Sequence, residues 1–429
     1  SAASDVYKRQ DMAYTDFIAA IDLGTSHMVG MVGTKNATGA LSIIAYEVEN
    51  SGTCIRRGCV YNVKETASKI KRLILKLENK LGGTKIGQVY VGLGGQSLRS
   101  IEHTVCKVLG TEGVVTEEII DSLYQECKDY RPDMLTVLDV VSPSYFLDDK
   151  PESNPVGVPC SRIEARYKLI VGRPSLKLNI VNSISEQAKI EIAGILVSPL
   201  ALGDVVLSDN EKDLGCALIG FGAGVTTISV YKGGKLASLS VVPFGGNLIT
   251  KDITNLRVVE SEAERLKITY GSAKADRDND MTIQVSLADG MGLREIKLAE
   301  LNGVIEARMD EILENVYARL EATGLMSVLG AGIVITGGGA ALKNLPAVMS
   351  ERLKMEVRYS AVRKGVVASG DLVVASNPEY AVAVGLLAKG TKNCALYIPP
   401  KPEPKPEPKV ELEPTVEPIV EPEPIKAVS

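Results

Sequence analysis

The chain has 429 residues, 45% of them hydrophobic, and a formal net charge of −5 at pH 7. This length suggests two to four domains, and the hydrophobic share is enough for ordinary cores. The negative charge leaves no basic footprint for nucleic acid. Seven dispersed cysteines without C-x-x-C spacing argue against a zinc or redox motif and for reduced thiols in a cytosol. With only two histidines, His27 and His103, histidine-based catalysis is not expected.

The first motif interrupts an apolar run near the start of the chain. A strand expected at 18–23 runs into a turn that contains Asp22, Gly24, Thr25 and Ser26, and a second strand follows at 28–34. Small residues let backbone N–H groups approach phosphate oxygens, and the two hydroxyls add donors. Asp22 would hold a magnesium ion through water. An ordinary tight hairpin is the alternative.

The next segments follow from apolar periodicity. Residues 64–81 have helical spacing, and Gly82-Gly83 ends that helix. A strand is expected at 89–93. Thr116 caps a further helix with an acidic first turn. Five prolines between 132 and 159 predict short strands and loops, and a helix is expected from 186 to about 194.

A second motif repeats the first in the other half of the chain. The apolar run 216–221 ends in Gly222, Ala223, Gly224 and Val225, with strands expected at 225–231 and 235–241. Two strand–turn–strand units of this kind could clamp one polyphosphate from both sides.

The third motif is a buried strand, 333–336, that runs into Gly337, Gly338 and Gly339 and then into a helix. Bare backbone of this kind suits a nucleoside or its phosphates. A strong amphipathic helix is expected over 301–320, and a helix of small residues over 379–389 would pack across the domain junction.

Three such units in this order resemble the actin–chaperone–sugar kinase superfamily of nucleotide-binding folds. Further segments are similar to the FtsA family of bacterial cell-division proteins, and together with the three motifs they cover about 16–392. These segments are 90–95, 154–157, 209–215, 245–253 and 263–271.

The resemblance implies an α/β, actin-like (ribonuclease H-like) fold with two lobes. Two duplicated large domains would each carry a small inserted subdomain. The first large domain would comprise 17–93, 167–195 and about 376–393, with the FtsA-type insert at 94–166. The second would comprise 196–246 and 303–375, with its small subdomain at 247–302.

The resemblance also implies ATP and magnesium between the large domains. Asp22 would face the metal, and the other residues would meet the nucleotide. Gly24, Thr25 and Ser26 would face the β- and γ-phosphates, with Gly222, Ala223, Gly224 and Val225 opposite them and Gly245 and Gly246 beside these. Glu264 and Lys267, three apart on one helix face, would meet the ribose and adenine, and Gly337, Gly338 and Gly339 the α-phosphate and base. A surface salt bridge and structural turns are the respective alternatives.

Three positions depart from the family pattern. Gly220 and Val225 stand where the second phosphate strand normally has Asp and Thr. Ser198 follows the domain crossover, where many superfamily ATPases have a residue that orients the attacking water. No catalytic residue is assigned, and hydrolysis is expected to be slow or absent.

The function implied by the resemblance is that of a cytoskeletal scaffold. It would bind ATP, assemble with itself and link FtsZ, through its C-terminal peptide, to the membrane at the division site and to later division proteins. An actin-fold enzyme, such as a sugar kinase or a chaperone ATPase, and a pilus-assembly adaptor are the alternatives. No carboxylate in a recognisable motif marks a kinase, and no substrate-binding β-domain follows the ATPase region.

Both ends of the chain are expected to be disordered. Residues 1–16 are polar and lack a signal peptide, and the first ten do not resemble the family. The tail, 394–429, is rich in Pro, Glu and Lys and cannot bury a core. It also lacks the amphipathic membrane helix with which the family usually ends, so either the chain stops before its anchor or another contact reaches the membrane.

Overall fold

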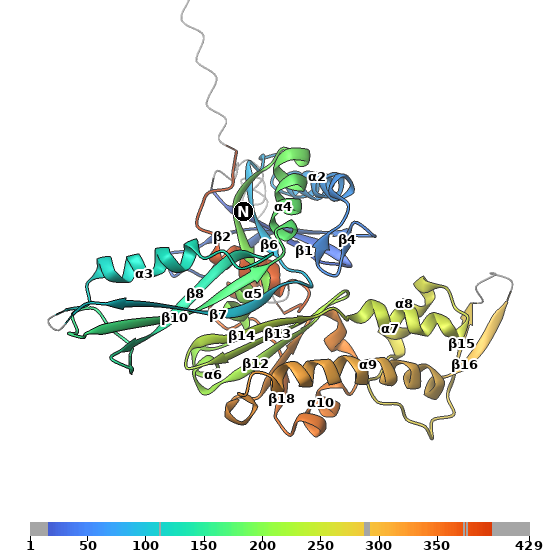
Figure 1. The fold of residues 1–429 in the computed structure, drawn as a ribbon. Helices are drawn as coiled ribbons and strands as arrows, with labels where there is room; N and C mark the ends of the chain where they lie inside the picture. Colours follow the sequence, from blue (N-terminus) through green and yellow to red (C-terminus); the bar gives the residue numbers. More distant parts are fainter. Residues whose placement is uncertain (1–15, 111–112, 287–291, 372–373, 375, 397–429) are drawn as a thin grey trace, which may run out of the picture. The chain divides into compact units, whose positions relative to one another are not determined.

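The computed structural model describes residues 16–110, 113–286, 292–371, 374 and 376–396. The expectations for 1–15 and 397–429 lie outside the described residues. Figure 1 shows the described chain as strands and helices interleaved in sequence, as expected for an α/β protein. No described helix combines the length and apolar character that a bilayer-spanning helix needs.

Two five-stranded sheets repeat one arrangement of strands. The first, in the order β11–β6–β1–β2–β3, contains β11 (Glu191–Val197), β6 (Gln88–Leu93), β1 (Ile18–Leu23), β2 (His27–Lys35) and β3 (Leu41–Asn50). The second, in the order β14–β13–β12–β17–β18, contains β14 (Lys235–Val242), β13 (Thr226–Lys232), β12 (Cys216–Phe221), β17 (Ile333–Thr336) and β18 (Val357–Tyr359). In both sheets the central strand is antiparallel to its hairpin partner and parallel to its other neighbour. The structure therefore has the duplication that the sequence predicted.

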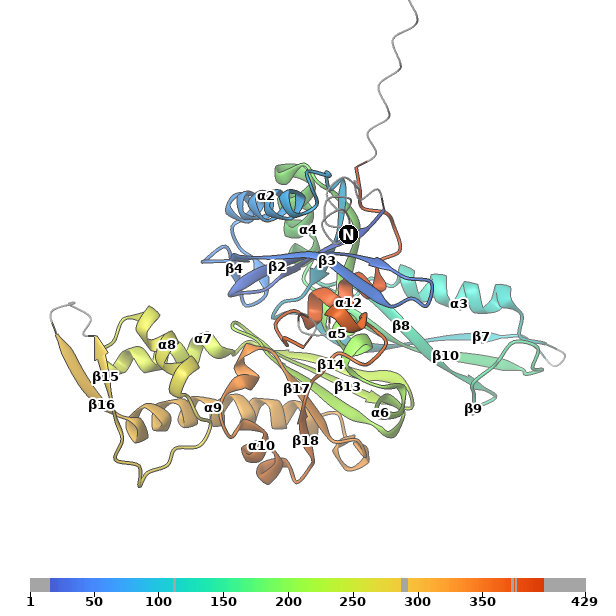
Figure 2. The same cartoon turned by 180° about the vertical axis from the view of Figure 1, so that it is seen from behind.

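Two helices bring the sheets into one core. α5 (Ser198–Val206) packs against α12 (Ala381–Lys389), and α12 also contacts β1, β2 and β6 (Figure 2). A Cβ on Gly385 would lie 2.3 Å from the carbonyl oxygen of Ala201, so only glycine allows this close approach. Ile21 and Leu386 share a buried cluster with Leu218 of the second sheet. The helix predicted over 379–389 is confirmed, with its first turn starting two residues later.

The helix expected over 64–81 is present and ends at the expected glycines. In α2 (Val63–Lys80), the Asn62 side chain accepts a hydrogen bond from the N–H of Glu65, and Gly82 and Gly83 follow with positive φ. The other helices among the described residues are α3 (Glu117–Asp129), α4 (Ser175–Val181), η1 (Asn182–Ala188), α6 (Asp209–Leu214), α7 (Gly246–Ile253), η2 (Thr254–Leu256), α8 (Glu260–Tyr270), α9 (Leu298–Glu321), η3 (Met326–Val328), η4 (Gly338–Ala341), α10 (Leu345–Leu353) and η5 (Ser369–Asp371).

The segment inserted after β6 contains longer strands than its prolines suggested. β7 (Arg99–Val108), β8 (Thr136–Leu147) and β10 (Arg162–Gly172) have 10, 12 and 11 residues, and β9 (Lys150–Glu152) completes the sheet. The expectation of short strands between 132 and 159 was wrong for β8 and is confirmed for β9. Pro143 lies within β8 where the pairing with β10 shifts register, and such irregularities tolerate a residue without an N–H.

The helix expected over 186–194 was wrong beyond Ala188. The π-helical turn η1 ends at Ala188, Lys189 has a left-handed φ of 61°, and β11 begins at Glu191. Apolar residues from Ile190 onward fit both a helix and a strand. Residues 191–197 form a strand because β11 pairs in parallel with β6.

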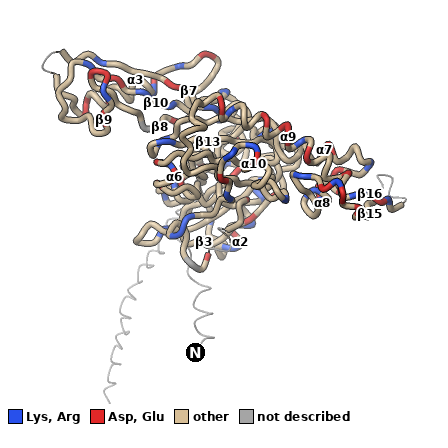
Figure 3. The backbone as a smooth tube through the Cα atoms, turned by 90° about the horizontal axis from the view of Figure 1, so that it is seen from below, with Lys and Arg blue, Asp and Glu red and all other residues tan. Residues whose placement is uncertain are grey.

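α9 contacts β13 and β14 of the second sheet and α7 of the second inserted segment, and its 24 residues include a buried stripe with Ile305, Met309 and Leu313. β15 (Thr282–Ser286) and β16 (Leu293–Lys297) form a separate hairpin. The small hairpin β4 (Ile55–Arg56) and β5 (Cys59–Val60) completes the strands. Figure 3 shows acidic and basic residues interspersed along α7, α8 and α9.

Candidate functional site

The first predicted loop joins β1 to β2 and is fixed by side chains. A Cβ on Gly24 would lie 2.5 Å from the carbonyl oxygen of His27, so the turn requires glycine. The buried Ser51 hydroxyl donates to the Gly24 carbonyl at 2.7 Å. Thr25 Oγ1 accepts from the N–H of Gly58 at 2.9 Å. The Ser26 hydroxyl lies 2.9 Å from His27 Nδ1.

Asp22 lies near the end of β1, beside Gly92 of β6, which has no side chain. A Cβ on Gly92 of β6 would lie 3.1 Å from Asp22 Oδ1 and 2.6 Å from Ser198 Oγ. Gly92 thus makes room for a carboxylate and a hydroxyl at the same place. Burial raises the pKa of Asp22 to about 6, against a smaller lowering by the backbone N–H of Leu23.

The second predicted loop joins β12 to β13 and is fixed by backbone. The N–H of Gly222 donates to the Val225 carbonyl at 2.9 Å. The carbonyls of Gly222 and Ala223 accept from Gly246 and Asn247, both at 2.9 Å. A Cβ on Gly245 would lie 2.5 Å from the Gly222 oxygen. Gly245 and Gly246 therefore support this loop, and the N–H of Gly246 is hydrogen-bonded to the Gly222 carbonyl.

The two loops meet directly. A Cβ on Gly224 would lie 2.6 Å from Thr25 Oγ1 and 3.0 Å from the Cα of Arg57. Only a residue without a side chain fits between those neighbours. Sequence positions about 200 residues apart thus face each other, as the two matching motifs predicted.

The third predicted loop lies against the end of β12. Gly337 has a left-handed φ of 86°, and a Cβ there would lie 2.5 Å from the carbonyl oxygen of Phe221. A Cβ on Gly339 would lie 3.0 Å from the Phe221 Cβ. Gly338 is more open, with Glu379 Oε1 3.6 Å from its Cβ position. Close backbone packing explains why glycine occupies the first and third positions.

Glu264 and Lys267 form an ion pair on α8, with Nζ and Oε2 2.6 Å apart. Lys267 Nζ also donates to Thr250 Oγ1 at 2.8 Å and to the Gly246 carbonyl at 3.1 Å. The salt bridge considered as an alternative is thus present, and it is anchored to the helix that supports the second loop.

The sequence reading missed two threonines beside Gly220. Gly220 pairs with Thr227 on β13 and with Thr336 on β17. Thr336 is 3% exposed, and among the described residues its Oγ1 has no hydrogen-bond partner. Its position directly before three glycines, at the end of a buried strand, was the available signal.

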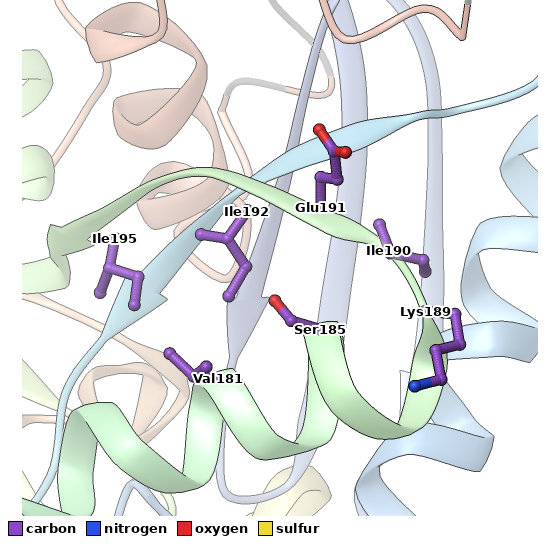
Figure 4. A pocket seen from close by; sticks show the side chains of 7 residues that line it. All are labelled: Val181, Ser185, Lys189, Ile190, Glu191, Ile192 and Ile195. Carbon is purple, nitrogen blue, oxygen red and sulfur yellow. The ribbon is translucent and has the colours of Figure 1, made fainter.

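A groove of about 550 Å³ lies elsewhere, along β11 and the end of η1 (Figure 4). Its lining residues are Val181, Ser185, Lys189, Ile190, Glu191, Ile192 and Ile195. None of the predicted nucleotide residues lines it. The loop geometry is therefore the stronger guide to the site.

A family model described as cell division protein FtsA matches residues 217–385. Curated cell division proteins FtsA are similar over most of the chain. The protein of Porphyromonas gingivalis is 39% identical over 382 residues, which are 89% of this chain and 79% of that protein. The Bacillus subtilis protein is 32% identical over 392 residues, which are 90% of this chain and 86% of that protein.

Two solved structures are similar in fold at low sequence identity. A PilM–PilN type IV pilus biogenesis complex has a TM-score of 0.60 and 16% identity, covering 86% of this chain and 97% of the matched chain. A MamK double helical filament has a TM-score of 0.50 and 12% identity, with the same coverage. These similarities confirm the predicted actin-like α/β fold. The sequence matches go further, and they show that the chain belongs to the cell division protein FtsA family.

Proposed function

We propose that this chain, an actin-like cell-division protein, binds ATP with magnesium between its two hairpin loops. As a scaffold it assembles with itself and links the FtsZ ring to the cytoplasmic membrane and to later division proteins. The observation that carries the nucleotide proposal is the direct approach of Gly224 to Thr25, which brings two phosphate-type turns together.

The residues present fit a polyphosphate. Gly24, Thr25 and Ser26 would face the β- and γ-phosphates, and the turn from Gly222 to Val225 would face them from the other side. Gly337, Gly338 and Gly339 would line the α-phosphate and base. Gly245 and Gly246 hold the second turn in place, and Glu264 and Lys267 meet the ribose and adenine. The unpaired Thr336 hydroxyl supports this reading, because buried polar groups normally have partners.

The donor set fits a magnesium ion held through water. Asp22 supplies one carboxylate, and within the described part of the chain no group of three or more His, Cys, Asp or Glu could hold a metal. Magnesium commonly keeps several waters and binds through one or two carboxylates and the substrate phosphates. The bound ion would neutralise phosphate charge.

Hydrolysis is proposed to be slow or absent. Gly220 provides no second carboxylate, and Ser198 lies near Asp22 where a water-orienting residue would be useful. A serine hydroxyl needs an adjacent base before it can act as one. Bound ATP would then favour one conformation instead of driving turnover. Steady-state turnover well above ~1 s⁻¹ would contradict this.

The second inserted segment, 247–302, is proposed to bind the C-terminal peptide of FtsZ. A pocket of about 390 Å³ there is lined by Asn255, Leu256, Arg257, Arg294 and Glu300. Arg294 Nη1 donates to the Leu256 carbonyl at 3.1 Å, which holds one guanidinium at the pocket. Two guanidinium groups beside a leucine suit a short peptide with an acidic residue and an apolar one.

Self-assembly and location at the division site are proposed on the basis of family membership. The fold neighbour MamK forms a double helical filament, which supports assembly as a property of this architecture. Attachment to the membrane is proposed through a partner or another contact, because the sequence of the tail 394–429 lacks an amphipathic helix.

Calorimetric titration of the full chain with ATP and magnesium tests the site. Asp22→Ala should weaken binding by about 10–100-fold through loss of the carboxylate that orients the metal's water. Gly338→Glu should also weaken it, because the new carboxylate would approach Glu379 and the phosphates. Gly303→Glu is the control, since a Cβ there meets nothing within 4 Å. Unchanged affinity in both site variants would contradict the assignment.

Fluorescence anisotropy with a labelled C-terminal peptide of FtsZ tests the partner. Arg294→Glu should abolish binding if the peptide occupies the pocket, whereas Arg277→Glu, paired with Glu306 outside it, should not. Absence of binding by the unmodified chain up to ~1 mM would remove the partner proposal.

A further inference from the structure

Gly220 is the centre of a row of three residues that crosses the second sheet. Thr227 lies opposite it on β13, and Thr336 lies beside it on β17. A Cβ on Gly220 would be 2.7 Å from Thr227 Oγ1 and 3.7 Å from Thr336 Cγ2. The Thr227 hydroxyl and the Thr336 methyl group therefore share the space above Gly220.

This row lies on the face of the sheet that looks toward the first sheet. Side chains alternate along a strand, so Gly220 shares a face with Leu218, and Thr336 with Val334. Leu218 and Val334 belong to the core cluster that also contains Ile21 and Leu386. The neighbouring residues Ile219 and Ile335 belong to the other cluster, around α9.

Among the described residues, the hydroxyls of this row have no hydrogen-bond partner. Thr336 Oγ1 is buried and unpaired, and the half-buried Thr227 makes no side-chain hydrogen bond with any described residue. The adjacent Thr226 behaves differently, since its hydroxyl donates to the Phe244 carbonyl at 2.9 Å. Leaving a buried hydroxyl unpaired is unfavourable, which points to a ligand that completes it.

The first sheet has the opposite arrangement of polar and small residues. Asp22 occupies the position of Gly220, with Val29 opposite it and Gly92 beside it. There the central strand carries the polar group and a flanking strand provides the space. In the second sheet the flanking strands carry the polar groups and the central strand provides the space.

We propose that Thr227 and Thr336 donate hydrogen bonds to phosphate oxygens of the bound nucleotide and take the place of a second carboxylate. The inference rests on the proposed nucleotide function. Hydroxyls are neutral donors that can bond phosphate oxygens directly, whereas a carboxylate needs an intervening cation or its waters. The second lobe should therefore hold the nucleotide with little dependence on magnesium.

Valine substitutions test the two hydroxyls, because valine keeps the shape of threonine. In the full chain, Thr336→Val and Thr227→Val should each raise the Kd for ATP about five- to tenfold, with or without magnesium. Without nucleotide, the thermal unfolding midpoint of Thr336→Val should stay equal to or exceed that of the unmodified chain. Thr226→Val is the matched control, and it should lower the midpoint equally with and without ATP.

Magnesium dependence gives a second measurement. The double variant Gly220→Asp/Thr227→Ala restores a carboxylate and removes the atom 2.7 Å from its Cβ. Its ATP affinity should fall more steeply on chelation of magnesium than that of the unmodified chain. An equal response in both proteins would overturn the inference.

Unchanged ATP affinity in both valine variants would also overturn it and would assign the threonines a structural role. If Thr336→Val fails to fold, Thr227→Val alone decides the question. Failure of the unmodified chain to bind ATP at ~1 mM is a different outcome, because it would remove the proposed nucleotide function itself.

Discussion

The two hairpin loops that meet at Gly224 and Thr25 are built on equivalent strands but present different chemistry. The first loop follows a strand that carries the half-buried carboxylate of Asp22. The second follows a strand that carries Gly220 between two threonines. The same strand order thus presents a carboxylate, Asp22, in the first sheet and two neutral hydroxyls, Thr227 and Thr336, in the second. The chemistry differs because the polar side chain lies on the central strand in the first sheet and on the two flanking strands in the second.

The loops are also held in different ways. Side-chain hydroxyls hold the first loop, through Ser51 to Gly24 and through Thr25 to Gly58. Backbone hydrogen bonds from the start of α7 hold the second. Side-chain truncations should therefore disturb the first loop most, and additions to glycine should disturb the second.

The largest expected effect is that of Asp22 on the free energy of unfolding. The folded pKa of Asp22, about 6, is above its ordinary value of 3.8. The stability that this carboxyl contributes is therefore complete below pH 3.8 and lost as pH rises through about 6, a loss on the order of 3 kcal/mol. Asp22→Asn should be more stable than the unmodified chain by that amount at pH 7 and equal to it near pH 4.

Urea unfolding at both pH values, without nucleotide, measures this difference. Asp278→Asn, at an exposed carboxylate, should follow the unmodified chain at both. Parallel pH profiles for Asp22→Asn and the unmodified chain would mean that Asp22 is not desolvated.

The contact between the loops should be the next most sensitive feature. Gly224→Val places new atoms against Thr25 and the backbone of Arg57, which should lower the free energy of unfolding by about 1–3 kcal/mol. ATP affinity should fall with it, because the loops are forced apart. Gly94→Ala is the control, since a Cβ there meets nothing within 4 Å. A Gly224→Val chain with unchanged stability and affinity would show that the loops do not need this contact.

The buried hydroxyl tethers should contribute less. Ser51→Ala leaves the Gly24 carbonyl without its donor, and the expected loss is about 1–2 kcal/mol in chemical denaturation. Thr226→Val should cost a similar amount in the second sheet. Thr104→Val, at an exposed strand position, should be neutral. Equal stability of Ser51→Ala and Thr104→Val would argue that the tether does not matter.

The smallest expected effect concerns the ion pair beside the second loop. Glu264 is 43% exposed, so Glu264→Gln should change the free energy of unfolding by less than ~1 kcal/mol. ATP affinity should still decrease if the pair meets the ribose and adenine. Unchanged affinity would leave Glu264 and Lys267 only their structural role toward α7.

The sequence alone was enough for features that depend on local chemistry. Thr116 caps a helix because its side chain accepts a backbone N–H group, and Gly82-Gly83 ends a helix because glycine adopts positive φ. The two glycine-rich turns were visible because each interrupts a buried apolar run. Their pairing across the chain followed from the repetition.

Tertiary structure decided what depends on neighbours distant in sequence. Residues 191–197 form a strand because β6 offers a parallel partner, although their apolar pattern also fits a helix. Pro143 lies within a long strand because a register shift accommodates it. The row of Thr227, Gly220 and Thr336 exists only once three strands pair, since no sequence spacing links residue 336 to residue 220. Strand register, which is set by packing and not by local preference, therefore determined which polar groups face the site.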